Sequence, residues 1–460
     1  AKMPIKEFLV KVFKPVFLVA TFSIVIPLLL RLNLTHGFNR FIIVALSSVS
    51  ITLIIIYCFG IGKKDKNFIK KNLIIIRMNL KTRIKNKIRI TYLQLKGFPQ
   101  IIKPKLSGTL KLFHFSAFSY GNAGDIILPI VLRDLINDKL SVKSWKGVHV
   151  KQNVNSKMVK KINNSNALVI GGGGLFLKDS HPNDVSGWQW NCDLEHLNKI
   201  DVPIIMFAVG YNRFRGQEEF KPIFTKHLNN FVEKAKFIGI RNYGSIRKIE
   251  SYLNDDLKDK LTFQPCMTTV ISNLYPNIVE YDNKEDFIAF NCAFDREKLR
   301  FNSESTLISI AKVAKKLSKI TKIKYFSHMP TDEKILPYFD KYNVVYSLIT
   351  FDNPYEMIDN YSKARLVIGM RGHAQMIPFG CRTSILSIVS HDKLQFFLDD
   401  IGKSEWGVEL QDDQLEEKLY DKAIDLYTNF KGNNQYISEI QKKFWDITQK
   451  NLEYIKKIIS

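Results

Sequence analysis

The sequence predicts an α/β protein with two doubly wound, Rossmann-like domains that face one cleft, preceded by an N-terminal helical hairpin. Its length of 460 residues, with 45% hydrophobic and 24% charged residues, is ordinary for a globular chain of two or three domains. From residue 109 onward, short apolar strands alternate with helical segments, which is typical of a parallel sheet covered on both faces. The first 62 residues hold two uncharged apolar stretches, which predict the hairpin.

The segment 1–105 is expected to anchor the protein to a membrane. Residues Phe41–Gly62 form an uncharged stretch of 22 residues, enough to cross a bilayer core as a helix, and Pro15–Leu30 is a shorter one kinked at Pro27. The stretch 63–105 then holds fourteen Lys and Arg against one Asp, which suits anionic lipid headgroups. The positive-inside rule places both ends of the hairpin in the cytoplasm. A monotopic amphipathic anchor is the alternative.

The net charge of +24 belongs mostly to this N-terminal segment. Residues 1–110 carry 20 Lys and Arg against two acids, and the remaining 350 residues carry only +6. Aliphatic residues, and not aromatic ones that stack on bases, interleave the basic side chains, so we expect no nucleic-acid partner. The five Cys are widely spaced without a CxxC pair or a Cys/His cluster, which indicates a reducing, cytoplasmic catalytic body without zinc or disulfides.

The first Rossmann-like domain is predicted over residues 106–275. It begins with a strand at Leu110–Phe115 and a helix at Ile126–Leu140. Three further buried strands are expected, at Ala167–Ile170, Pro203–Val209 and Phe237–Ile240.

The second domain is predicted over residues 286–460, after the turn-rich boundary Leu274–Glu285. Its strands are expected at Phe287–Asn291, Ile323–Ser327, Val344–Ile349, Leu366–Gly369 and Ile385–Val389. Helices are expected at Glu304–Lys319 and Tyr355–Lys363, from His373, and at the C-terminus over Asp412–Phe430 and Gln435–Ile458.

Ligands of open parallel sheets bind in the loops that follow the strands, so the residues of those loops are candidates for the site. Gly121, Asn122, Gly124 and Asp125 follow the first strand and open a helix, whose N-terminus suits a phosphate or a carboxylate. Asp125 would cap that helix or bind a sugar hydroxyl. The spacing is not that of a dinucleotide-binding GxGxxG loop.

A run of four glycines, which includes Gly172, Gly173 and Gly174, follows the strand Ala167–Ile170. Four consecutive glycines cost chain entropy on folding, so the run indicates a close approach by a ligand or a neighbouring strand.

Arg371 and His373 follow the strand Leu366–Gly369 and are separated by one glycine. Histidine exchanges a proton near neutral pH, and arginine is a permanent cation that holds an anion. Arg241 and Lys393 also follow strands and are candidate anion ligands. A surface arginine paired with an acid is the alternative for Arg241.

Taken together, these segments resemble the polysaccharide pyruvyl transferase family. The matching pieces are GNAGD, LVIGGGGLF, IGIRNYGSIRK, ARLVIGMRGHAQMIPFG and SHDKLQFFLDDIG, and they span roughly Leu110 to Trp406. The resemblance implies a fold like that of the two-domain GT-B glycosyltransferases. It also implies transfer of a pyruvyl group from phosphoenolpyruvate to two hydroxyls of a sugar, which forms a cyclic ketal.

The resemblance further implies roles for these residues. His373 would be the acid or base, Arg371 would hold the phosphate or carboxylate of the donor, and Arg241 and Lys393 would assist. Asn122, Asp125 and the glycine loop would line the acceptor side or the cleft. No metal or cofactor is implied. Cys266 stands where family members often place an acid, which is a departure from the pattern.

The expected acceptor is a cell-surface polysaccharide or its lipid-linked precursor. A membrane-anchored enzyme with a cytoplasmic body suits such a precursor at the inner membrane of a bacterium. Two alternatives stay open: a GT-B glycosyltransferase of the same pathway that uses a nucleotide-sugar, and an inactive scaffold. The sequence does not predict the oligomeric state.

Overall fold

The structure, a computed structural model, describes residues 9–33, 38–57, 107–118, 123–178, 184–276, 278–301, 304–351 and 354–459. The chain forms two compact units, residues 1–88 and residues 89–460. Each unit is described by itself.

The first unit contains a pair of apolar helices. A π-helical turn, Leu9–Phe13, leads into α2 (Lys14–Asn33), and α3 (Phe38–Ile55) packs on α2. Thr52 Oγ1 donates a hydrogen bond of 3.0 Å to Ser23 Oγ between them. Both predicted helices are therefore present, and many of their apolar side chains are exposed.

The predicted crossing of a membrane has no support in this unit. Within the described ranges, no helix combines the length and the apolar character that a bilayer crossing requires. The predicted polybasic segment 63–105 lies outside the described residues.

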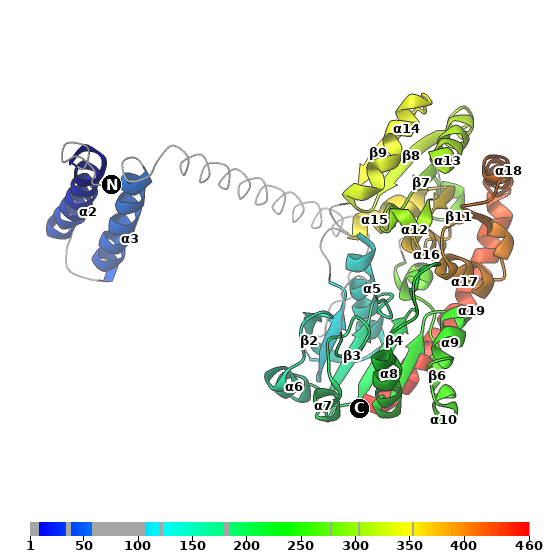
Figure 1. Ribbon diagram of the computed structural model, residues 1–460, viewed down its shortest axis with the longest axis horizontal. Helices are drawn as coiled ribbons and strands as arrows, with labels where there is room; N and C mark the ends of the chain where they lie inside the picture. The colour runs from blue at the N-terminus through cyan, green and yellow to red at the C-terminus, as the bar shows by residue number, and fades with distance from the viewer. Residues whose placement is uncertain are drawn as a thin grey trace. The chain divides into compact units, whose positions relative to one another are not determined.

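The second unit is built on two six-stranded sheets, in which every strand pairing is parallel (Figure 1). The first sheet has the order β2-β1-β3-β4-β5-β6. Its strands are β1 Leu110–Ser116, β2 Val142–His149, β3 Ala167–Gly171, β4 Ile204–Val209, β5 Phe237–Ile240 and β6 Leu261–Phe263. Strands β3, β4 and β5 are buried throughout, as expected for inner strands with helices on both faces.

The second sheet has the order β12-β11-β10-β7-β8-β9, the doubly wound order of a Rossmann fold. Its strands are β7 Phe287–Asn291, β8 Lys322–Ser327, β9 Tyr346–Thr350, β10 Leu366–Gly369, β11 Ser384–Val389 and β12 Gly407–Glu409. The predicted α/β class with two Rossmann-like halves is thus confirmed. The strand order reverses between β1 and β3 in the first sheet and between β10 and β7 in the second.

Helices connect the strands and cover the sheets. In the first half they are α5 Ala123–Lys139, α6 Ser156–Asn163, α7 Leu194–Asn198, α8 Pro222–Lys234, α9 Tyr243–Glu250, α10 Asp255–Lys258 and α11 Ile271–Leu274. In the second half they are α12 Glu297–Arg300, α13 Glu304–Leu317, α14 Leu336–Lys341, α15 Pro354–Lys363, α16 His373–Gly380, α17 Asp392–Asp400, α18 Leu415–Thr428 and α19 Phe430–Ile459.

Helix α19 links the two halves of the second unit. It runs from the second sheet back to the first, and the chain ends beside the first half (Figure 1). Near its end, Asn451 Nδ2 donates hydrogen bonds of 3.0 Å to Phe263 O and to Gln264 Oε1. The predicted domain limits stay a prediction, because both sheets belong to one compact unit.

Candidate active site

A cavity of about 230 Å³ lies between the two halves of the second unit. Its lining residues come from loops after β1, β2, β3, β4, β5, β7, β8, β10 and β11, so the cavity collects strand carboxyl ends from both sheets, including both points where the strand order reverses. Open α/β sheets bind their ligands at such points. Polar and charged residues dominate the lining: Asp125, Lys151, Gln189, Asn212, Arg241, Asp295, Arg296, Arg300, Arg371, His373, His391 and Lys393.

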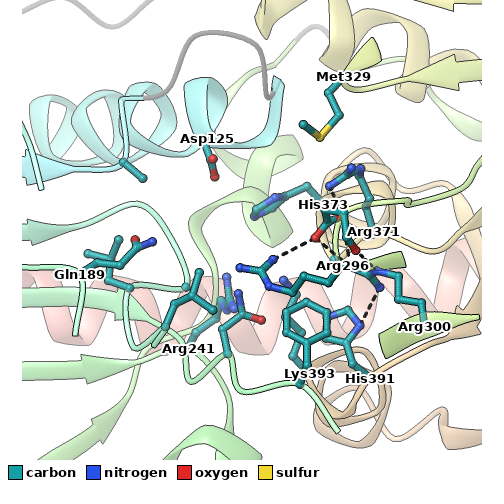
Figure 2. A pocket seen from close by; sticks show the side chains of 18 of the residues that line it. Asp125, Gln189, Arg241, Arg296, Arg300, Met329, Arg371, His373, His391 and Lys393 are labelled. Atoms are coloured by element: carbon teal, nitrogen blue, oxygen red, sulfur yellow. Dashed lines mark hydrogen bonds and ion pairs between the residues drawn. The ribbon is translucent and has the colours of Figure 1, made fainter. Parts of the chain in front are cut away.

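Six of the residues predicted from the sequence lie in this one cavity. They are Asp125, Gly174, Arg241, Arg371, His373 and Lys393. Figure 2 shows His373, Arg371 and Lys393 on one side, and Asp125 and Arg241 reaching toward them from elements of the first half.

Gly172 and Gly173 do not line the cavity. Gly172 has a φ of +84°, and a Cβ on it would lie 2.7 Å from Ser116 Oγ and 3.1 Å from Pro129 N. A glycine is therefore required at position 172, both by the backbone conformation and by the close packing of helix α5. Gly121 and Asn122 lie outside the described residues.

His373 is the first residue of α16, and its ring faces the start of α5. A Cβ on Gly124 would lie 2.4 Å from His373 Nδ1, so only a glycine lets the helix approach the ring so closely. His373 Nε2 is enclosed and has no hydrogen-bond partner among the described residues. Burial, together with the charges of Arg241 and Lys393, lowers the pKa of His373 well below its ordinary value. The imidazole is therefore neutral at neutral pH.

Arg371 is held by two carboxylates. Its Nε and Nη2 bind Asp332 Oδ2 and Oδ1 at 2.8 and 2.5 Å, and its Nη1 lies 3.1 Å from Asp295 Oδ1. Burial opposes the charge of Arg371, but the carboxylates outweigh it and raise the pKa of the guanidinium. Asp332, in the turn Pro330–Ile335, is fully buried. The positive charge of Arg371 is thus largely compensated within the protein.

Asp295 gathers two further arginines. Arg296 Nη1 and Arg300 Nη2 lie 3.1 and 3.2 Å from Asp295 Oδ2. Burial opposes ionisation of Asp295, but Arg300, Arg371 and Lys393 outweigh it and lower the pKa of the carboxyl. This carboxylate therefore stays ionised and orients three arginines along one wall.

Arg241 and Lys393 are the cations that lack such partners. Arg241 is 3% exposed, and its Nε and Nη2 make no hydrogen bond to the described residues. Lys393 has no ion pair with any described carboxylate; burial and the charges of Arg241 and Arg300 lower its pKa to about 7. Buried charge without a counter-ion is costly, so these two side chains favour an anionic ligand.

Asp125, in the first turn of α5, carries a proton more readily than an ordinary Asp. Burial raises the pKa of its carboxyl to about 6, although Lys393 and Arg371 act in the opposite direction. The cavity thus combines a neutral imidazole, a carboxyl that is partly protonated near neutral pH, and two uncompensated cations. This is the set of groups that acid–base chemistry on an anionic substrate requires.

Several lining residues were not predicted. Asp295, Arg296 and Arg300 follow β7, and Asn212 and Phe214 follow β4. Both strands were predicted, so their following loops carried a usable signal. No such signal marked Gln189 and Lys151. Gln189 lies in an irregular segment, and Lys151 follows β2, a strand that we did not predict from the apolar pattern.

Metal binding has no visible place in the described stretches of the chain, where no group of three or more His, Cys, Asp or Glu side chains could hold an ion. The expectation that no metal or cofactor is needed stays a prediction.

A family model described as Polysaccharide pyruvyl transferase matches residues 54–392. The match covers well over half of the chain and includes every cavity residue named above except Lys393, which follows its last position. No curated protein matches the chain in sequence.

Among solved structures, the chain is similar to an S. aureus MnaA–UDP co-structure, with 12% identity, a TM-score of 0.45, and 72% of this chain and 91% of that one covered. A sucrose-phosphate synthase from Thermosynechococcus elongatus is 10% identical with a TM-score of 0.44, and the match covers 76% of this chain and 98% of that one. These likenesses are distant, and the architecture given above is based on strand order alone.

Proposed function

The chain belongs to the polysaccharide pyruvyl transferase family, whose members are transferases of polysaccharide modification, and from that premise we propose that the cavity transfers a pyruvyl group. The donor would be phosphoenolpyruvate and the product a cyclic ketal on two hydroxyls of a sugar. The acceptor would be a cell-surface polysaccharide or its lipid-linked precursor. The observation that carries the proposal is the pair of buried, uncompensated cations, Arg241 and Lys393, beside a neutral His373.

Phosphoenolpyruvate carries a phosphate and a carboxylate, and the cavity carries an excess of positive charge. Six Lys and Arg side chains against two Asp form its described lining. Arg241 and Lys393 are suited to bind the donor directly, because neither forms an ion pair with a carboxylate of the described residues. Arg371 is less suited than the sequence pattern suggested, because its nitrogens already face Asp332 and Asp295. We propose that Arg371 shapes the wall beside His373 instead.

The proposed reaction needs one proton donor and one proton acceptor. Asp125, protonated in part near neutral pH, would give a proton to the methylene carbon of the donor while a sugar hydroxyl attacks the neighbouring carbon. His373 would take the proton of that hydroxyl. The second hydroxyl then attacks the same carbon, and the carbon–oxygen bond to phosphate breaks with its electron pair. Of the two hydroxyl protons, one accounts for the new methyl group and the other leaves with phosphate.

The proposal is tested by incubating the full chain with phosphoenolpyruvate and a lipid-linked saccharide. We expect release of inorganic phosphate and an acceptor whose mass is raised by one pyruvate ketal. Release of a nucleoside diphosphate from a sugar nucleotide, without phosphate from phosphoenolpyruvate, would replace the proposal with glycosyl transfer. If the chain catalyses neither reaction but retains partner enzymes in a pull-down, it is a scaffold.

We also propose that α2 and α3 attach the protein to a membrane, with the catalytic body in the cytoplasm. Their exposed apolar side chains support this, since Ile24, Leu32 and Leu46 are 65, 72 and 63% exposed. Large exposed apolar patches mark membrane or protein contacts. In cell fractions, release by alkaline carbonate would indicate a peripheral anchor and release by detergent alone a spanning one. Recovery in the soluble fraction without detergent would contradict attachment.

A further inference from the structure

Phe214 is an aromatic residue of the first half that is buried against the second half. It lies in the loop 210–219 after β4 and is 2% exposed. Its ring stacks on the imidazole of His391, with ring centroids 4.7 Å apart and an angle of 17° between the planes. The guanidinium carbons of Arg296 and Arg300 lie 4.6 and 4.9 Å from its centroid. One ring from the first half therefore contacts three cavity side chains of the second.

These three partners, His391, Arg296 and Arg300, line the same side of the cavity as Asp295, and we call them the cationic wall. Arg296 and Arg300 share Asp295, and Arg300 Nη1 also lies 3.2 Å from His391 Nδ1 and binds Ser390 Oγ. Asp295 binds both guanidinium groups, and both also lie against the ring of Phe214. Long arginine side chains lose conformational freedom when they are held by two kinds of contact, so the ring restricts where these charges point.

The backbone on both sides of the contact has a conformation that L-residues rarely adopt. Arg296 has a φ of 55°, and Ala208, in β4, has a φ of 53° where the pairing with β5 shifts register. A bulge of this kind re-aims the end of a strand, here the loop that carries Phe214. Such conformations persist only where the surroundings enforce them, and they gather at functional sites.

The next residue of the loop, Arg215, also reaches the second half. Its Nε lies 2.6 Å from Asp392 Oδ1 and its Nη1 lies 2.8 Å from Glu409 Oε2. All three side chains are 41–46% exposed, so these pairs contribute little energy in water. They do fix the direction from which the loop enters the second half.

We propose that Phe214, which the first half contributes to the arginines of the second, is a positioning residue for the anionic donor. The ring stacks on His391 and orients Arg296 and Arg300 along the cavity. Without the ring, the cations remain in the chain but lose their fixed directions. The inference rests on the proposed function, since it adds Arg296 and Arg300 to Arg241 and Lys393 as cations around the donor.

The test compares three variants of the full chain. Phe214→Leu removes the aromatic face; we expect the KM for phosphoenolpyruvate to rise about 30-fold, or about 2 kcal/mol at 1.4 kcal/mol per factor of ten, with a much smaller change in kcat. Phe214→Tyr keeps the ring and should restore the KM. Phe220→Leu is the matched control, because Phe220 stacks at 4.2 Å on Phe224 within the first half. It should lower stability and leave the KM unchanged.

Binding of inorganic phosphate, measured by calorimetry, distinguishes a failure of the positioning role of Phe214 from a failure of the proposed pyruvyl transfer. If phosphate binds tightly to the wild type and weakly to Phe214→Leu, the positioning role is supported. This holds even if phosphoenolpyruvate is not turned over, because the absence of turnover contradicts only the proposed function. An unchanged phosphate affinity and an unchanged KM in Phe214→Leu would overturn the positioning role. If the Leu variant does not fold, Phe214→Met, which keeps apolar bulk without an aromatic face, serves the same comparison.

Discussion

Substituting Gly124→Ala should separate catalysis from folding in this protein. Gly124 is the second residue of helix α5 and does not have a positive φ, so the backbone there accepts alanine without strain. The added Cβ, however, would lie 2.4 Å from His373 Nδ1, whereas ordinary contacts begin near 3.4 Å. The imidazole must therefore move by about 1 Å. A displacement of that size at a reacting group costs about 100-fold in rate.

The assay measures steady-state phosphate release from phosphoenolpyruvate in the presence of acceptor, together with the melting temperature. We expect kcat to fall about 100-fold, equivalent to about 2.7 kcal/mol, with the fold retained and a modest decrease in melting temperature from the displaced ring. Gly432→Ala in helix α19 is the matched control, because its Cβ would meet only the flexible end of the exposed Asn429 side chain. Wild-type turnover in Gly124→Ala would refute the placement of the His373 ring at the reacting centre. A large loss of stability would show that the contact serves packing.

Three further substitutions test the groups around His373. His373→Gln should lower kcat by about 10²–10⁴-fold with the melting temperature retained, and normal turnover would remove His373 from proton transfer. Burial lowers the pKa of Lys393 to about 7, so the charge of this side chain is lost as the pH rises through that value, and titration calorimetry should show that phosphate binding weakens there. The variant Lys393→Arg should keep its phosphate affinity at higher pH. If the wild type and the variant show the same pH dependence, Lys393 is not its cause. Asp332→Asn leaves Arg371 without its bidentate partner and should lower the free energy of unfolding by about 3 kcal/mol in urea titrations, whereas a change below about 1 kcal/mol would mean that Asp295 compensates fully.

Much of the fold was predictable because parallel strands covered on both faces are short apolar runs. β3, β5, β7 and β10 were located to within about one residue of their ends, as such runs permit. β2 was missed because it is an edge strand whose exposed positions hold Lys143, Ser144 and Lys146, which break the apolar pattern. The return of helix α19 to the first half was not predicted either, because an amphipathic pattern shows that a helix buries one face and not what covers it.

The cavity residues that could be predicted from the sequence are those whose position follows from the topology of the sheets alone. Loops that follow parallel strands meet at one edge of a sheet, and this brought Asp125, Arg241 and His373 together from distant parts of the sequence. Asp332 and its bidentate contact with Arg371 were not foreseen. A carboxylate 39 positions away in sequence has no local pattern that marks it as the partner of a given arginine.

Charge compensation, and not charge number, distinguishes the cations of the cavity from one another. Arg296, Arg300 and Arg371 share Asp295 and are therefore directed by the protein, while Arg241 and Lys393 are buried without such a partner. The first group keeps its geometry whether or not a ligand is bound, because its counter-charge is internal. The second group feels the charges of Asp295 and Asp400 without a direct ion pair among the described residues, so binding of an anion relieves part of the desolvation cost of burying these cations. An anionic donor should for this reason raise the melting temperature of the wild type more than that of a Lys393→Met variant.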